Sequence, residues 1–75
     1  MKYEEIYERL TTTGVAYILD DFEGVAVRLV HGQEGTMAYA KRNGKKEFKT
    51  KTSEKYVFNV VIEGKEITKE EYDSY

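Results

Sequence analysis

Apolar residues in the first part of the chain recur at helical spacing. They occupy positions i, i+3, i+4 and i+7 of one helical face: Tyr3, Ile6, Tyr7 and Leu10. The threonines at positions 11–13 and Gly14 interrupt this pattern, because β-branched side chains lose rotamer freedom in a helix and glycine favours chain exit. We therefore expect an N-terminal helix that ends near residues 11–13.

The next two segments alternate apolar residues with a period of two. The first series is Val15, Tyr17 and Leu19, and the second is Val25, Val27 and Leu29. Alternation of this kind is typical of strands. The acidic turn at 20–24 is short, so an antiparallel hairpin is expected. The segment 31–35, with glycines at 32 and 35, is expected to be a loop.

The pair Asn43-Gly44 predicts a second hairpin with a type I′ turn, since both central positions of that turn need positive φ. A two-residue loop sets the opposite residues: Arg42 with Lys45, Lys41 with Lys46, Ala40 with Glu47, Tyr39 with Phe48, and Met37 with Thr50. The predicted inner face then carries Met37, Tyr39 and Phe48. The predicted solvent face carries Ala38, Ala40, Glu47 and Lys49.

Residues 56–62 are apolar on both faces of a predicted strand. Tyr56, Phe58, Val60 and Ile62 alternate with Val57, Asn59 and Val61. A strand that is apolar on two sides is expected at the centre of a sheet. Gly64 is expected to end this strand.

A capping box marks the start of a short C-terminal helix. Thr68 and Glu71 have the spacing of the box, and Ile67 and Tyr72 have that of a hydrophobic staple. Tyr72 is expected to hold the C-terminal segment against the body, with Tyr75 adding to the contact. The predicted fold class is α+β: an N-terminal helix, an antiparallel meander of about five strands, and a short C-terminal helix.

The composition agrees with one domain spanning residues 1–75. The hydrophobic fraction of 40% and the charged fraction of 35% are typical of a globular chain. The absence of cysteine excludes disulfides and thiolate metal sites. The acidic N-terminus has no apolar region typical of a secretory signal, and apolar runs are far shorter than a membrane span. A cytoplasmic location is expected.

Charge is strongly segregated although the formal net charge is only −2. The segment 41–55 contains seven basic and two acidic residues, which gives it a charge of +5 and leaves −7 for the rest. A partner would therefore meet a bipolar molecule, which disfavours a uniformly acidic mimic of nucleic acid.

Groups for catalysis or metal binding are few. His31 is the single imidazole, so a two-histidine metal site is excluded. The carboxylates Asp20, Asp21 and Glu23 lack the ligand spacing of a calcium loop and are interpreted as solvated turn residues. No glycine-rich phosphate loop precedes a helix. We therefore predict no catalytic residue, no metal and no cofactor.

The basic hairpin is the candidate site. Its cations are expected to meet an anionic partner: Lys41, Arg42, Lys45, Lys46, Lys49 and Lys51. Four aromatic residues could stack on single-stranded bases if their face is open, although a core position is favoured in so small a domain: Tyr39, Phe48, Tyr56 and Phe58. The segment 55–60 does not match the RNP1 pattern of RRM domains.

We interpret the chain as a small non-enzymatic protein-binding module that docks through its basic hairpin. Small, charged, cysteine-free domains are common among accessory proteins of phages and mobile elements, which suggests by analogy an inhibitor or regulator of a host protein. The alternatives are a sheet-based binder of single-stranded nucleic acid and a structural subunit that buries strand 56–62 in a homodimer. A lysine-rich strand that only prevents edge aggregation also remains open.

Overall fold

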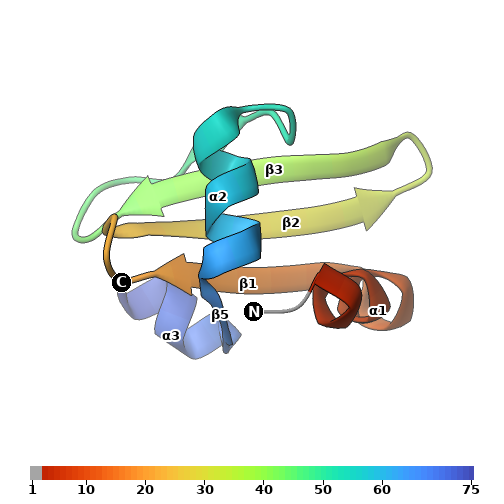
Figure 1. Cartoon of the computed structure of the whole chain (residues 1–75), viewed down its shortest axis with the longest axis horizontal. Helices are drawn as coiled ribbons and strands as arrows, with labels where there is room; N and C mark the ends of the chain where they lie inside the picture. The colour runs from red at the N-terminus through yellow and green to blue at the C-terminus, as the bar shows by residue number, and fades with distance from the viewer. Residues whose placement is uncertain (1–2) are drawn as a thin grey trace.

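The computed structural model describes residues 3–75, and this part of the chain forms three helices and five strands (Figure 1). In chain order they are α1 (Tyr3–Thr13), β1 (Val15–Asp20), β2 (Val25–Gly32), β3 (Gly35–Arg42), β4 (Phe48–Thr50), α2 (Lys55–Glu63), β5 (Lys65–Ile67) and α3 (Lys69–Ser74).

The strands form one antiparallel sheet in the order β4-β3-β2-β1-β5. Strands β1 to β4 are a meander, and α2 then carries the chain back across the sheet so that β5 pairs with β1 (Figure 1). The predicted fold class, α+β with an N-terminal helix and a five-stranded antiparallel sheet, is confirmed. The central strand is β2, however, and not the segment 56–62.

The N-terminal helix and the first hairpin follow the predictions. Helix α1 ends at Thr13, and Gly14 takes a φ of 84° while its N–H donates to the carbonyl of Leu10. Ile6 is buried, whereas Tyr7 was expected on the same buried face and is 61% exposed. The side chain of Tyr3 lies outside the described residues.

The segment 55–63 is a helix, so the prediction of a central strand there is wrong. The buried residues of α2 are Val57, Val60 and Val61, and the buried Gly64 follows as its C-cap. Their spacing of i, i+3, i+4 and i+7 is helical, but apolar residues on the exposed side of α2 obscured it. Packing of this stripe on the sheet outweighs the low helix propensity of valine.

Small side chains on the sheet make room for α2. Ala16, Ala38 and Ala40 are fully buried in one cluster with the three valines of α2. The expectation that Ala38 and Ala40 face solvent is therefore wrong, because a helix covers their side of the sheet. Alanine suits this position because a helix can lie close to a strand that carries short side chains.

The β2–β3 connection is tighter than predicted. Gly32 pairs with Gly35, so only residues 33 and 34 form the turn, and the segment 31–35 is not a loop. Gly35 has a φ of 112°, which supports the predicted use of glycine for positive φ. The longer hairpin extends β2 and β3 beyond the part of the sheet that α2 crosses (Figure 1).

The β3–β4 connection is longer than the predicted two residues. Within residues 3–75 only glycines have positive φ, so Asn43 does not adopt the conformation that a type I′ turn requires. Gly44 has a φ of 76°, and the N–H of Lys45 donates to the carbonyl of Arg42, as in a type II turn. Residues 43–47 therefore separate the two strands.

This longer connection displaces the register. Phe48 pairs with Ala40 instead of Tyr39, and Lys49 pairs with Tyr39. Because side chains alternate between the faces of a strand, the shift moves Phe48 to the face of Ala40. The predicted inner face of Met37, Tyr39 and Phe48 is therefore wrong: Met37 and Phe48 are exposed, and Tyr39 is half-buried on the opposite face.

The helices lie on both faces of the sheet. Helices α1 and α2 cover one face, where Ile6, Ile18, Val27 and Val60 belong to the main core. Helix α3 lies behind the sheet in Figure 1 and packs on a smaller cluster around Ala26 and Ile67. No helix in residues 3–75 has the length and apolar character needed to cross a membrane.

The predicted capping box of α3 is confirmed. The Thr68 hydroxyl accepts a hydrogen bond from the backbone N–H of Glu71 at 3.1 Å, and the Glu71 carboxylate accepts one from the N–H of Thr68 at 2.9 Å. Tyr72 is buried against Ile67, and its ring centroid lies 5.2 Å from that of Tyr17. Tyr75 packs on the same cluster, as expected.

Candidate functional site

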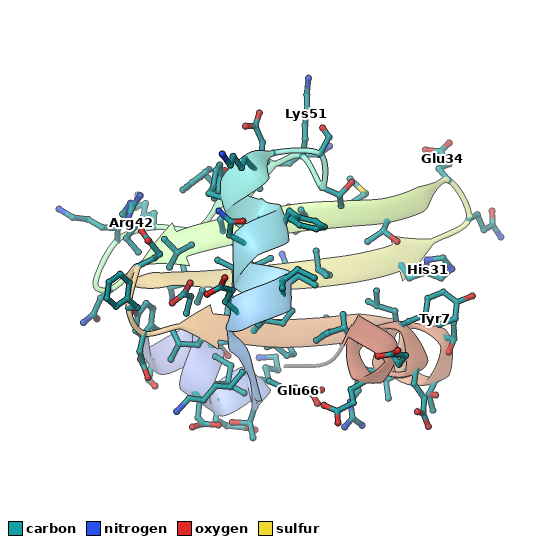
Figure 2. The ribbon with its side chains drawn as sticks, viewed as in Figure 1. Tyr7, His31, Glu34, Arg42, Lys51 and Glu66 are labelled. Atoms are coloured by element: carbon teal, nitrogen blue, oxygen red, sulfur yellow. The ribbon has the colours of Figure 1, made fainter. Side chains whose placement is uncertain are left out.

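The basic residues gather along the β4 side of the sheet. Arg42 lies at the end of β3 and Lys51 directly follows β4, and Figure 2 shows both at the margin of the molecule, away from Glu66 of β5. Strand β4 is an edge strand. The fold therefore keeps the cations of the segment 41–55 on the β4 side of the sheet, away from the β5 edge.

Lys41 and Arg42 are partly engaged within the fold. The Nζ of Lys41 donates to the carbonyls of Tyr72 and Asp73 at 3.1 and 3.4 Å and lies 5.2 Å from the centroid of the Tyr72 ring. Arg42 donates to the carbonyl of Glu23 at 3.4 Å. Lys41 thus holds α3 against the sheet, and its ammonium is engaged by the carbonyls of α3.

Four other cations of the predicted site are exposed. Lys45, Lys46, Lys49 and Lys51, which we term the lysine edge, have no ion pair within residues 3–75. The salt bridges in this part of the chain instead join Arg9 to Glu66, Arg28 to Glu47, Lys65 to Asp21, and Lys69 to Asp73. The lysine edge is therefore a concentration of positive charge in which no lysine forms a salt bridge within residues 3–75.

Glu47 follows Lys46 in the sequence, but its salt bridge is to Arg28 and not to the lysine edge. Its carboxylate accepts two hydrogen bonds from Arg28, each at 2.9 Å, and one from the Tyr72 hydroxyl at 2.6 Å. The guanidinium of Arg28 also lies 4.2 Å from the centroid of the Tyr39 ring. Glu47 was expected to face solvent, and it is exposed, but its carboxylate is also the centre of a network that links the β3–β4 connection to α3.

This hydrogen-bond network shifts the pKa values of Glu47 and Tyr72. Hydrogen bonds from Arg28 are the main cause that lowers the pKa of Glu47 from its ordinary value of 4.5, and the bond from Tyr72 acts in the same direction. Burial and the hydrogen bond to Glu47 raise the pKa of Tyr72. The ion pair therefore persists under mildly acidic conditions.

The lowered pKa of Glu47 predicts a pH-dependent contribution to stability. Because the folded pKa lies below the unfolded value, the contribution is complete above about pH 4.5 and is lost as pH falls through the folded pKa. We expect Glu47→Gln to lower the free energy of unfolding by about 1 kcal/mol at neutral pH, since this partly exposed pair is screened by solvent. The difference from the wild type should shrink as pH falls toward 3.

Urea unfolding of both proteins across this pH range measures the effect. Glu34→Gln is the matched control, because Glu34 is exposed at the β2–β3 turn and has no ion pair within residues 3–75 (Figure 2). A difference between wild type and Glu47→Gln that stays constant with pH would show that the ionised carboxylate does not contribute.

The four candidate stacking residues are not brought together. Tyr39 lies on the α3 side of the sheet, whereas Phe48, Tyr56 and Phe58 lie on the α2 side. The prediction that these aromatic residues belong to the core is wrong for Phe48, Tyr56 and Phe58. Phe48 is 50% exposed, and the other two are also exposed. Phe48 and Tyr56 line a hollow of about 220 Å³ with Val25, Lys41 and Arg42.

Asp20 of the acidic turn and His31 both have partners within the fold. Asp20 accepts hydrogen bonds from the N–H groups of Phe22 and Glu23, so its carboxylate stabilises the turn. The Nδ1 of His31 lies 3.2 Å from the hydroxyl of Thr36 on the neighbouring strand. Within residues 3–75 no three acidic or histidine side chains are grouped as metal ligands.

Comparison with protein-family models gives no match, and comparisons with curated proteins and with solved structures give none either. The site must therefore be understood from the residues of this chain alone. Reasoning from sequence located the basic residues but missed the network of Arg28, Glu47 and Tyr72, because these residues are distant in sequence. It also missed the exposed aromatic residues of α2, which the helical spacing of Val57, Val60 and Val61 could have indicated.

Proposed function

We propose that this chain is a non-enzymatic protein-binding module that binds an acidic surface of another protein through the lysine edge. In this proposal binding takes place in the cytoplasm, and the module acts as an inhibitor or regulator of its partner. The observation that carries the proposal is the absence of salt bridges at the lysine edge within residues 3–75, whereas Arg9, Arg28, Lys65 and Lys69 each pair with a carboxylate.

Electrostatic complementarity accounts for selection of an acidic partner. Like charges that are close in space disfavour folding, so the lysine edge is better explained by an interaction with an anionic surface than by stabilisation of the domain. Strand β4 also pairs with β3 on one side only. Its outer edge can accept backbone hydrogen bonds from a partner strand, and the lysines beside it would select acidic residues.

Affinity capture from the native cell tests this proposal with two charge-reversal variants. Lys45→Glu combined with Lys46→Glu is expected to abolish recovery of the partner. Lys65→Glu combined with Lys69→Glu introduces the same change in net charge on β5 and α3 and is expected to retain it. Both pairs are exposed, so both variants should remain folded.

The outcome is decided by the difference between the two variants. Equal recovery with Lys45→Glu/Lys46→Glu and with the wild type contradicts the proposal. Equal loss with both variants shows that net charge alone drives recovery and also contradicts a specific lysine edge. Circular dichroism of each variant confirms that the fold is retained.

Single-stranded nucleic acid is a second candidate because Phe48, Tyr56 and Arg42 surround a hollow beside the lysines. Exposed aromatic rings next to cations are typical of sites that stack bases. Fluorescence anisotropy with labelled oligonucleotides tests this candidate: log affinity should fall against log salt with a slope of about −0.7 per neutralised phosphate. Absence of binding at low salt removes it.

The structure removes the premise on which a homodimer was expected. That expectation relied on a strand at 56–62 with two apolar faces, and this segment is the helix α2. Its valines are already buried on the sheet. We therefore do not propose a structural homodimer from this segment.

A further inference from the structure

A groove of about 420 Å³ opens between α1 and α2 on the face of the sheet that these helices cover. It arises because α2 crosses the middle of the strands while α1 lies beside the start of β1, at the same end of the sheet as the β2–β3 turn (Figure 1). Its base is formed by apolar residues of three elements: Ile6, Leu10, Leu29, Val57 and Val61. This volume lies in the range of about 300–1,000 Å³ that is typical of binding pockets.

Two aromatic side chains at the rim of the groove face solvent. Tyr7 of α1 is 61% exposed and Phe58 of α2 is 58% exposed, and both line the groove. Large exposed aromatic residues around an apolar depression are typical of binding sites for apolar side chains. Polar residues of the groove include His31 and Thr36, which are paired on the adjacent strands β2 and β3.

The side chains that line the groove carry no carboxylate, ammonium or guanidinium group. Selection by charge must therefore take place next to the groove. Thr52 lines the groove and directly follows Lys51, and the exposed Lys55 begins α2 in the same connection. Neither lysine has an ion pair within residues 3–75. Two lysines and the single carboxylate of Glu54 thus border the groove at the β4–α2 connection, where positive charge is in excess.

We propose that the groove receives one or two apolar side chains of the partner. These side chains belong to a segment whose acidic residues contact Lys55 and the lysine edge, of which Lys51 lies next to the groove. This inference rests on the proposed protein-binding function and defines the chemistry of the partner: an acidic peptide segment with aromatic or aliphatic anchors. The groove supplies apolar contact, and the lysines determine which apolar segments are accepted.

Selection from a random peptide library displayed on phage tests this inference on the full chain. Peptides that combine acidic residues with Phe, Trp, Leu or Ile are expected to be enriched. Synthetic copies of the enriched peptides should bind Phe58→Ala and Tyr7→Ala about tenfold or more weakly than the wild type. Phe22→Ala is the matched control, because Phe22 is 93% exposed in the β1–β2 turn and does not line the groove.

The possible outcomes distinguish failure of the groove inference from failure of the proposed function. Acidic peptides that bind Phe58→Ala and Tyr7→Ala as tightly as the wild type overturn the groove inference but leave the proposed function intact. Apolar peptides that need the groove but ignore Lys45→Glu/Lys46→Glu contradict the acidic partner and the proposed function. Absence of any enriched peptide overturns this inference, as does a wild-type dimer that Phe58→Ala dissociates in sedimentation experiments, because a second copy would then occupy the groove.

Discussion

Alanine at position 64 is expected to destabilise the protein by about 3 kcal/mol, because the extra methyl group has no room. A Cβ atom at Gly64 would lie 2.6 Å from the carbonyl oxygen of Val60 and 2.7 Å from that of Leu19. It would also lie 2.9 Å from the Cγ2 of Ile18 in the centre of the core. Two of these atoms belong to the backbone, so relief requires α2 to move away from β1.

Urea unfolding of Gly64→Ala measures this loss, and Gly32→Ala provides the control. Gly32 has no left-handed φ, and the nearest atom to an added Cβ there is 3.9 Å away. The control should therefore change stability by less than about 0.5 kcal/mol. Similar stability of Gly64→Ala and the wild type would mean that α2 does not approach β1 as closely as described.

Replacement of Tyr72 by alanine is expected to cost about 3–5 kcal/mol. Tyr72 is buried between α3 and the sheet, where it packs against Ile67 and the ring of Tyr17. Its hydroxyl also donates to Glu47, so alanine removes both the apolar contact and one partner of the carboxylate. In a domain of this size the loss is comparable to the whole free energy of unfolding.

Two further variants separate these contributions. Tyr72→Phe keeps the ring and is expected to lose about 1 kcal/mol, the contribution of the hydroxyl to Glu47. Tyr7→Ala removes an exposed tyrosine and should change stability by less than about 0.5 kcal/mol. If Tyr72→Ala and Tyr7→Ala are equally stable, α3 is not held by its tyrosine.

Tyr72→Ala should also alter the dynamics of the β3–β4 connection. The N–H of Gly44 donates to the carbonyl of Tyr75 at 2.7 Å, and Lys41 donates to carbonyls of α3. Loss of α3 packing in Tyr72→Ala therefore exposes the amide of Gly44 to solvent. Hydrogen exchange at Gly44 that accelerates more than exchange at the amides of β2, measured by NMR, would show that α3 supports the segment that carries the lysine edge.

Local patterns predicted several elements because their determinants are close in sequence. The spacing of apolar residues located α1, the alternation at 15–19 and 25–29 located the first hairpin, and the Thr68–Glu71 box located α3. Gly44 was correctly expected at positive φ, since only glycine adopts it without steric cost. The basic residues could also be assigned to one region, because the turn at Gly44 keeps them together.

The assignment of residues 55–63 failed because the sequence satisfies two patterns. Alternation of Tyr56, Phe58 and Val60 fits a strand, and the stripe of Val57, Val60 and Val61 fits a helix. The choice between them depends on the alanines of the sheet, which accept a helix at short distance. Residues far apart in the chain thus decide the conformation of this segment.

The register of β3 and β4, and with it the candidate site, also depends on distant contacts. Glu47 pairs with Arg28 and Tyr72 and lies outside β4, in a connection of five residues. Which lysines remain available for a partner follows from these same contacts, since Lys41 is engaged by α3. The sequence alone showed that the cations are close together along the chain, but not which of them are engaged in the fold.

Short-range periodicity, turn chemistry and capping were thus sufficient for α1, the β1–β2 hairpin, α3 and the location of the cationic segment. Tertiary packing decided that α2 is a helix, which faces of β3 and β4 are buried, and which lysines are unpaired. The physical reason is that local conformational preferences differ by only about 1 kcal/mol per residue or less, whereas burial of a side chain contributes about 1.5–3 kcal/mol.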